Sequence, residues 1–159
     1  MAKLADVMAF LIREYPEYQR RDLSNARLTK LIYLSDWHQS LVSGRQITPI
    51  KWYFDNYGPY VNDVREEAMR NLDLFELEPG TNALGGSKLT IGLKDLSYQP
   101  QLEERETKSL THVIEVTSPL IWADFIKLVY ATHPIASSER YTYLDLVAKA
   151  RDYKPSRVA

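Results

Sequence analysis

Residues 24–44 read SNARLTKLIYLSDWHQSLVSG, and this stretch decides the fold. Its apolar positions recur at helical spacing along one side, with aromatic residues beside them, so more than one side of the helix is suited to burial. Either Asp22 or Ser24 can cap its N-terminus, and Gly44 is suited to its C-terminal cap. We therefore expect a central helix from about Ser24 to Ser43 that other elements cover on more than one side.

A first helix is predicted before this one, because a single apolar stripe with helical spacing precedes Pro16. The members of the stripe are Leu4, Val7, Met8, Leu11, Ile12 and Tyr15. A polar stretch from Glu17 to Arg21 leads to the central helix. A third helix is predicted to start at Pro59, since proline suits the first helical position. Its expected buried residues are Val61, Val64, Ala68 and Leu72.

Residues 74–78 and 88–93 alternate apolar and polar positions, with Pro79 and several glycines between them. This pattern predicts a small β-hairpin with a long, mobile loop. Three more helices are expected: one around residues 110–117, one that starts at Ser118-Pro119, and one capped by Ser137 or Ser138. The last of them is expected to bury Tyr143, Leu146, Val147 and Ala150.

The fold class that these elements predict is mainly α, a compact multi-helix domain with a small β-hairpin. We expect residues 1–153 to form a single domain and residues 154–159 to be a frayed tail. The chain of 159 residues has 20 basic and 21 acidic residues and no cysteine, which excludes disulfides and thiolate chemistry. No apolar run approaches the length of a membrane span, and an acid at Asp6 interrupts any signal-like start, so we expect a cytoplasmic protein.

Aromatic residues with a polar tip are unusually common: there are 11 tyrosines and three tryptophans but only four phenylalanines. Tyr and Trp are enriched where proteins meet their partners, although packing at the edge of a core is the commoner role of any single one. Several of them gather in the connector from Trp52 to Tyr60. We expect this connector to form or support a partner-binding surface.

The segment from Arg27 to Val64 carries a recognisable series of residues. It consists of RLTKLIYLSD at 27–36, GRQIT at 44–48, Trp52 and YGP at 57–59. In this order and at these separations, the series resembles the Panacea domain of SocA-like antitoxins. Weaker similarity extends to Trp122, Phe125, Leu128 and His133-Pro134.

The resemblance implies a helical domain with a small β element that neutralises a cognate protein toxin, usually encoded nearby, by direct protein contact. It also implies an alternative, an adaptor that delivers the toxin to a cellular protease. The residues expected to contact the partner are Trp52, Tyr53, Tyr57, Tyr60, Arg45 and Lys51. Those expected to be structural are Lys30, Tyr33, Gly44, Gly58 and Pro59, with a direct binding role for Lys30 and Tyr33 left open.

Other classes of function have little support in the sequence. The three histidines show no metal-ligand spacing, and no nucleophile or phosphate-loop motif is present, so we expect no enzyme, no metal and no cofactor. DNA binding, as a regulator of its own operon, is an alternative because three helices precede a hairpin and basic residues lie at 20–21, 27 and 30. Asp63, Glu66 and Glu67 on the candidate recognition helix argue against DNA as the partner.

Overall fold

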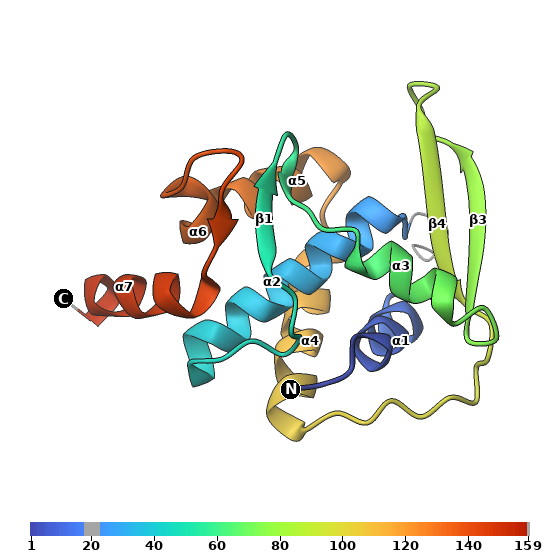
Figure 1. The fold of residues 1–159 in the computed structure, drawn as a ribbon, viewed down its shortest axis with the longest axis horizontal. Coiled ribbons are helices and arrows are strands. Elements are labelled where there is room, and N and C mark those ends of the chain that lie inside the picture. Colours follow the sequence, from blue (N-terminus) through green and yellow to red (C-terminus); the bar gives the residue numbers. More distant parts are fainter. Residues whose placement is uncertain (18–22, 159) are drawn as a thin grey trace.

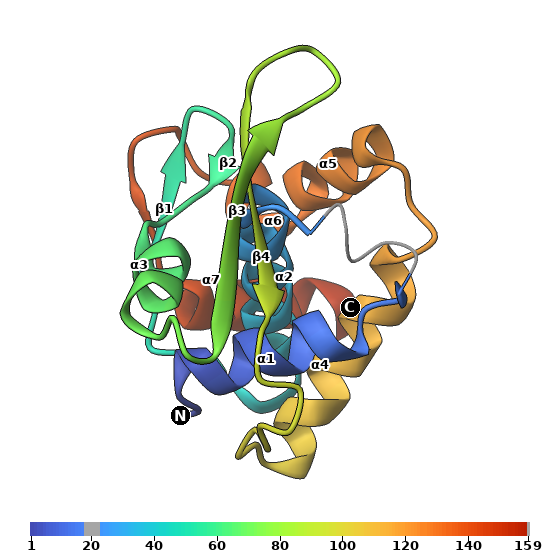
Figure 2. The same ribbon diagram turned by 90° about the vertical axis from the view of Figure 1, so that its right-hand side faces the viewer.

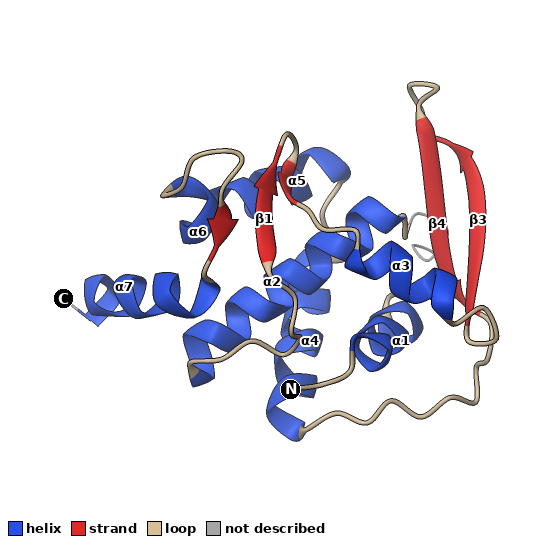
Figure 3. Ribbon diagram, in the orientation of Figure 1, coloured by secondary structure: helices blue, strands red, loops and turns tan. Residues whose placement is uncertain are grey.

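The computed structural model describes residues 1–17 and 23–158, with side chains up to Tyr153, and shows a mainly helical protein with minor β structure (Figures 1 and 3). Its helices are α1 (Leu4–Glu14), α2 (Asn25–Ser43), α3 (Asp63–Arg70), α4 (Glu104–Thr117), α5 (Trp122–Ala131), α6 (His133–Ala136) and α7 (Leu146–Val158). Its strands are β1 (Trp52–Asp55), β2 (Gly58–Pro59), β3 (Phe75–Thr81), β4 (Ser87–Leu93) and β5 (Tyr143–Leu144). This confirms the predicted fold class. None of the described helices combines the length and apolarity of a bilayer span.

The predicted central helix is α2, and it occupies the middle of the molecule (Figures 1 and 2). Every residue from Arg27 to Trp37 is buried, because α1, α3, α4, α7 and β4 all contact this helix. The Ser24 hydroxyl caps its N-terminus by accepting a hydrogen bond from the Arg27 N–H at 3.1 Å. Gly44 ends it in the left-handed conformation, with φ of 76°. Asp22, the other candidate cap, and the polar stretch beyond Glu17 lie outside the described residues.

Helix α1 ends directly before Tyr15 and Pro16, as its stripe predicts, and buries Val7, Met8 and Leu11. The predicted hairpin is β3–β4, paired from Phe75 opposite Leu93 to Thr81 opposite Ser87. It stands at the end of the molecule opposite α7 (Figure 1). The outer edge of β4 pairs with the chain before α2, since the Ile91 N–H donates to the Leu23 carbonyl at 3.1 Å.

The hairpin loop is shorter than predicted, because both strands extend through Pro79-Gly80 and up to Ser87. Only residues 82–86 connect them. The side-chain oxygen of Asn82 accepts hydrogen bonds from the N–H groups of Leu84 and Gly86 at 3.0 and 2.9 Å. Asn side chains commonly organise turns in this way, so a compact turn replaces the expected long loop.

Three predicted helix starts are wrong, and each error has a local cause. Pro59 lies in β2 opposite Phe54, and α3 begins only at Asp63. Ser118 ends α4 and so does not begin a helix; α5 begins at Trp122. The last helix begins at Leu146, after β5. The local cause is that Ser and Pro suit turns, helix ends and strand ends as well as helix starts. At Pro59 and before α7, pairing with β1 gives a strand, whereas Ser118 caps the end of α4.

Two residues assigned to the core lie on the surface. Leu72 is exposed because α3 ends at Arg70, before the turn that would have buried it. Tyr143 is exposed because it belongs to β5 and not to the last helix. Four other predicted core residues are buried, as expected: Val64, Ala68, Leu146 and Ala150. Helix α7 runs to Val158 and so includes the backbone of most of the expected frayed tail.

Candidate functional site

A fully buried carboxylate on α2 holds the connector that leads to the aromatic segment. Asp36 Oδ1 accepts hydrogen bonds from the backbone N–H groups of Ile47 and Thr48 at 2.8 and 2.9 Å. Its Oδ2 accepts from the Thr48 hydroxyl at 2.6 Å and from the indole N–H of Trp52 at 2.9 Å. The Ile-Thr turn and the tryptophan that follow Gly44 are therefore positioned by one acid on the central helix.

Burial raises the pKa of Asp36 to about 6, and its hydrogen bonds from Thr48, Trp52 and Ile47 oppose this rise. The folded state therefore holds the proton more tightly than the unfolded state does. The stability that this group contributes is fully present below the ordinary pKa of aspartate and is lost as the pH rises through about 6.

Tyr33 and Trp52 join the connector to the helices behind it. The two rings meet edge to face with centroids 5.5 Å apart. The Tyr33 hydroxyl is 2.8 Å from the Thr132 hydroxyl in the turn between α5 and α6, and burial raises the pKa of Tyr33. A hydrogen bond from Tyr33 to a neighbouring turn agrees with the structural role predicted for it.

Strand β1 then carries the chain outward to a tight turn between Asp55 and Gly58. Trp52 and Phe54 point inward and are buried, while Tyr53 points to the other side and is partly exposed. Gly58 has φ of 101°, a conformation that side chains disfavour, and its Cα faces the ring of Tyr130 on α5. The Gly-Pro step thus closes a hairpin turn that displays Tyr57.

A segment far away in sequence braces this turn. The Tyr141 N–H donates to the Phe54 carbonyl at 2.6 Å, and the Tyr141 hydroxyl donates to the side chain of Asn56. Tyr141 has φ of 67°, unusual for a residue other than glycine. The guanidinium of Arg140 lies 5.5 Å from the Phe54 ring centre, and its Nε donates to the Asn56 carbonyl at 3.3 Å.

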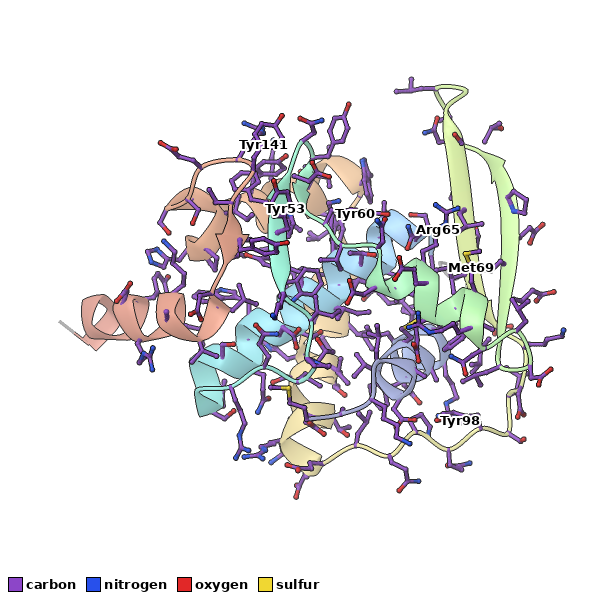
Figure 4. The ribbon with its side chains drawn as sticks, in the orientation of Figure 1. Tyr53, Tyr60, Arg65, Met69, Tyr98 and Tyr141 are labelled. Atoms are coloured by element: carbon purple, nitrogen blue, oxygen red, sulfur yellow. The ribbon has the colours of Figure 1, made fainter. Side chains whose placement is uncertain are left out.

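Together these strands present what we call the tyrosine surface, defined by Tyr53, Tyr57, Tyr141 and Tyr143. Tyr53 and Tyr143 are paired across β1 and β5 with ring centroids 5.1 Å apart. Tyr57, Tyr141 and Tyr143 are 82%, 60% and 74% exposed. Figure 4 shows Tyr53 and Tyr141 beside β1 on the upper side of the view, and Tyr98 on the opposite, lower side near α1. Exposed, mutually braced aromatic side chains are typical of protein-binding surfaces.

The structure brings together only part of the predicted contact set. Tyr53 and Tyr57 lie on the tyrosine surface, and Lys51 lies on the same outer side of the connector as Tyr53, because neighbouring strand residues alternate. Tyr60 lies at the edge, where its hydroxyl accepts a hydrogen bond from the Asn25 amide at 3.2 Å. Trp52 lies in the core, and Arg45 lies beside the end of α2, at the start of the connector.

Sequence reasoning missed Tyr141, Tyr143 and Arg140. The signal that could have found them is the alternation in Tyr141-Thr142-Tyr143-Leu144, which follows a polar turn and is typical of a short strand. A helix assigned to the whole segment concealed this alternation.

An acidic cleft of about 680 Å³ lies on another part of the molecule, between α1 and α3. Its acidic lining residues are Asp63, Glu66, Glu67, Asp73 and Asp95, against the basic Lys3 and Arg70. Acids on this side of α3 would repel a phosphate backbone. Of the basic residues that favoured DNA, Arg27 and Lys30 are buried, and Arg20 and Arg21 lie outside the described residues.

Two histidines stack where α2 packs on α4. The rings of His38 and His112 have centroids 4.4 Å apart. The Ser109 hydroxyl donates to Gln39 at 2.6 Å, so it accepts from Nδ1 of His38 at 2.8 Å. Burial, with a smaller contribution from His112, lowers the pKa of His38. No group of three His, Asp or Glu side chains in the described chain could hold a metal ion.

We expect this histidine pair to make folding sensitive to acid. Because the folded state holds the His38 proton less tightly than the unfolded state, stability is lost as the pH falls below about 6.5, the ordinary histidine pKa. His38→Gln should flatten the fall in unfolding free energy between pH 7 and pH 5, and His112→Gln should flatten it less. Urea denaturation at several pH values measures both; equal slopes in the wild type and His38→Gln would contradict this assignment.

A family model described as antitoxin SocA-like, Panacea domain, matches residues 28–134. This range includes most of α2 and all of the connector, the hairpin and α5. Neither the curated proteins nor the solved structures contain a match to the chain.

Proposed function

Because this chain belongs to the SocA-like antitoxin family with the Panacea domain, we propose that it binds a protein toxin in the cytoplasm and neutralises it through the tyrosine surface. The observation that carries the proposal is the exposure of Tyr57, Tyr141 and Tyr143 around the small sheet of β1, β2 and β5. Large aromatic side chains dominate the energy of many protein interfaces. Exposure of three of them to water is unfavourable for the free chain, and burial of their rings against a partner would be favourable.

The tyrosine surface is suited to tight binding because much of it is already ordered. The Tyr141 hydroxyl is held by Asn56, and Tyr143 packs against Tyr53. Side chains fixed before binding lose less conformational entropy on association. In this proposal Tyr53, Tyr57, Tyr141 and Tyr143 are the anchors, and Lys51 and Arg140 set the electrostatic register.

In the proposal, the other residues that were predicted to contact the partner do not serve as anchors. Trp52 supports the surface from the core, where Asp36 and Tyr33 fix its ring. Tyr60 lies at the margin of the interface. Arg45 is left outside it, since it lies beside the end of α2.

Neutralisation in this scheme is steric occlusion of the toxin, and no covalent bond is made or broken. The protease adaptor and the DNA-binding regulator remain alternatives from family resemblance and from sequence. Toxin half-life separates occlusion from delivery to a protease, because only delivery shortens it. A salt-dependent shift of the chain's own promoter fragment would identify a DNA-binding regulator.

The test is growth rescue. The protein encoded next to this chain is expressed alone, with the wild-type chain, and with Tyr57→Ala or the double variant Tyr57→Ala/Tyr143→Ala. We expect the wild type to restore growth, Tyr57→Ala to weaken binding by about 2 kcal/mol and the double variant to fail. Tyr57→Ala removes a ring that is 82% exposed, so the free energy of unfolding should change by less than about 0.5 kcal/mol. The double variant also loses the contact between Tyr143 and Tyr53, which should cost about 0.5–1.5 kcal/mol.

Leu84→Ala is the matched control, because Leu84 is 97% exposed at the tip of the β3–β4 hairpin, outside the tyrosine surface. It should rescue growth as the wild type does. Full rescue by the double tyrosine variant would refute the tyrosine surface as the binding site. Rescue lost in Leu84→Ala but retained in the tyrosine variants would move the site to the hairpin.

A further inference from the structure

Two positive side chains are buried on α2 without a negative partner. Arg27 is 8% exposed and Lys30 is 4% exposed. In the described part of the chain no acidic side chain forms an ion pair or hydrogen bond with either of them. Lysine and arginine are almost never buried unless they are paired, because removing an ammonium or guanidinium group from water is costly.

Lys30 in particular does not extend its ammonium group to the surface, as long basic side chains usually do. A snorkelling lysine keeps its ammonium in water, whereas only 4% of the surface of Lys30 is exposed. Burial lowers the pKa of Lys30, and no opposing hydrogen bond or charge contributes. Lys30 is therefore a buried basic group without an acidic partner among the described residues.

The two cations lie three residues apart, so they share one side of α2. Arg27 lies 5.3 Å from the ring centres of both Trp122 and Phe125 on α5. One turn beyond Lys30, Tyr33 reaches Thr132 in the turn after α5. Arg27 and Tyr33 thus span the space between α2 and α5 on either side of Lys30.

The residues around the two cations adjoin the proposed binding surface. Trp122, which covers Arg27, is 45% exposed. On the other side, the Tyr60 hydroxyl bonds Asn25 at the start of α2, and Gly58 faces Tyr130 of α5. The turn that displays Tyr57 and the helices that enclose the two cations are therefore in direct contact.

We propose that Arg27 and Lys30 receive the carboxylate of an aspartate or glutamate side chain of the neutralised toxin, which enters between α2 and α5 past Trp122. This inference rests on the proposed function and adds an acidic anchor to it. A guanidinium and an ammonium together can bind a carboxylate with several charge-assisted hydrogen bonds.

Lys30→Met tests the proposal, because methionine is of similar length and uncharged. We expect the melting temperature to rise by about 2–4 °C, since an unpaired buried charge is removed. We expect the affinity for the toxin, measured by titration calorimetry with both full-length chains, to fall about 30-fold or more. Lys127→Met on α5 is the matched control; Lys127 is exposed, so neither quantity should change.

The toxin supplies the second half of the test. Each of its surface acids is changed to the corresponding amide, and each variant is titrated against the wild type and Lys30→Met. One amide substitution should weaken binding to the wild type at least about tenfold and leave binding to Lys30→Met unchanged, the signature of a coupled pair. If no acid shows this coupling, the carboxylate assignment is wrong.

The anion site and the tyrosine surface can be tested separately. If Tyr57→Ala weakens binding and Lys30→Met does not, the tyrosine surface stands and the anion site is refuted. A Lys30→Met chain less stable than the wild type would show that Lys30 has a structural partner, which also refutes it. If inorganic phosphate raises the melting temperature of the wild type but not of Lys30→Met, while Lys30→Met binds the toxin normally, the site serves a free anion and the proposal is overturned.

Discussion

Asp36→Ala is expected to lower the free energy of unfolding by about 4 kcal/mol. The carboxylate is the common acceptor for two backbone N–H groups, the Thr48 hydroxyl and the Trp52 indole, all of them buried. Each buried donor left unpaired costs about 1–3 kcal/mol, and relaxation or an entering water recovers part of the sum. Urea denaturation followed by circular dichroism measures the change.

Ser40→Ala is the matched control on the same helix. Ser40 is also buried, but its hydroxyl donates to the backbone carbonyl of Asp36 at 2.7 Å. This hydrogen bond lies within α2 and does not reach the connector. Its loss should cost less than about 1 kcal/mol. A similar cost for both variants would mean that Asp36 does not hold the connector.

The Asp36 effect should also depend on pH in a defined direction. Because the pKa of Asp36 is raised to about 6, its contribution to stability is largest in acid and declines as the pH rises through that value. The difference between the wild type and Asp36→Ala should therefore shrink between pH 4 and pH 7. The histidine pair acts in the opposite direction, so the comparison is made between these two proteins at each pH.

Gly58→Val is expected to lower the free energy of unfolding by about 2–3 kcal/mol and to abolish growth rescue. A side chain at φ of 101° is strained by about 1–3 kcal/mol. A branched one also presses on the ring of Tyr130, because a Cβ added at Gly58 would already lie 3.6 Å from that ring. The backbone can escape only by moving the turn. Because that turn displays Tyr57, binding is lost together with stability.

Gly80→Val provides the control for Gly58→Val. Gly80 lies in β3 with no neighbouring atom within 4 Å of an added Cβ, and valine suits a strand. Stability should change by less than about 0.5 kcal/mol, and rescue should be normal. If Gly58→Val proves equally harmless, the turn geometry is not required for either folding or binding.

The parts of the fold that local signals determine were predictable from the sequence. Helix α2 has a serine cap, a glycine at its end and apolar residues around most of its circumference, and all three features act within the helix itself. The β3–β4 hairpin joins neighbouring strands, so alternation on both sides of a turn is enough to indicate it.

The parts that depend on distant partners were not predictable. Strand β5 is only two residues long, and Tyr143 pairs with Tyr53, which lies far away in the sequence. The role of Pro59 depends on pairing with Phe54, because a Gly-Pro step suits both a helix start and a strand after a turn. In the sequence, Asp36 is one of several polar residues of a helix. Its role depends on hydrogen bonds from Ile47 and Thr48, which only the folded structure shows. Only half of the candidate site was thus predictable from the sequence. Tyr53 and Tyr57 lie in one connector, whereas Tyr141 and Tyr143 come from a separate segment.

The enclosure of α2 has a consequence for how the chain folds during synthesis. The helix is translated early, but Trp37 packs against Tyr153 of α7 with ring centroids 5.9 Å apart. The side of α2 that packs against α7 therefore stays uncovered until α7 has left the ribosome. Nascent chains that stall before α7 would expose this surface to chaperones and proteases. The core around α2 is therefore closed only after α7 has been synthesised, late in the translation of this domain.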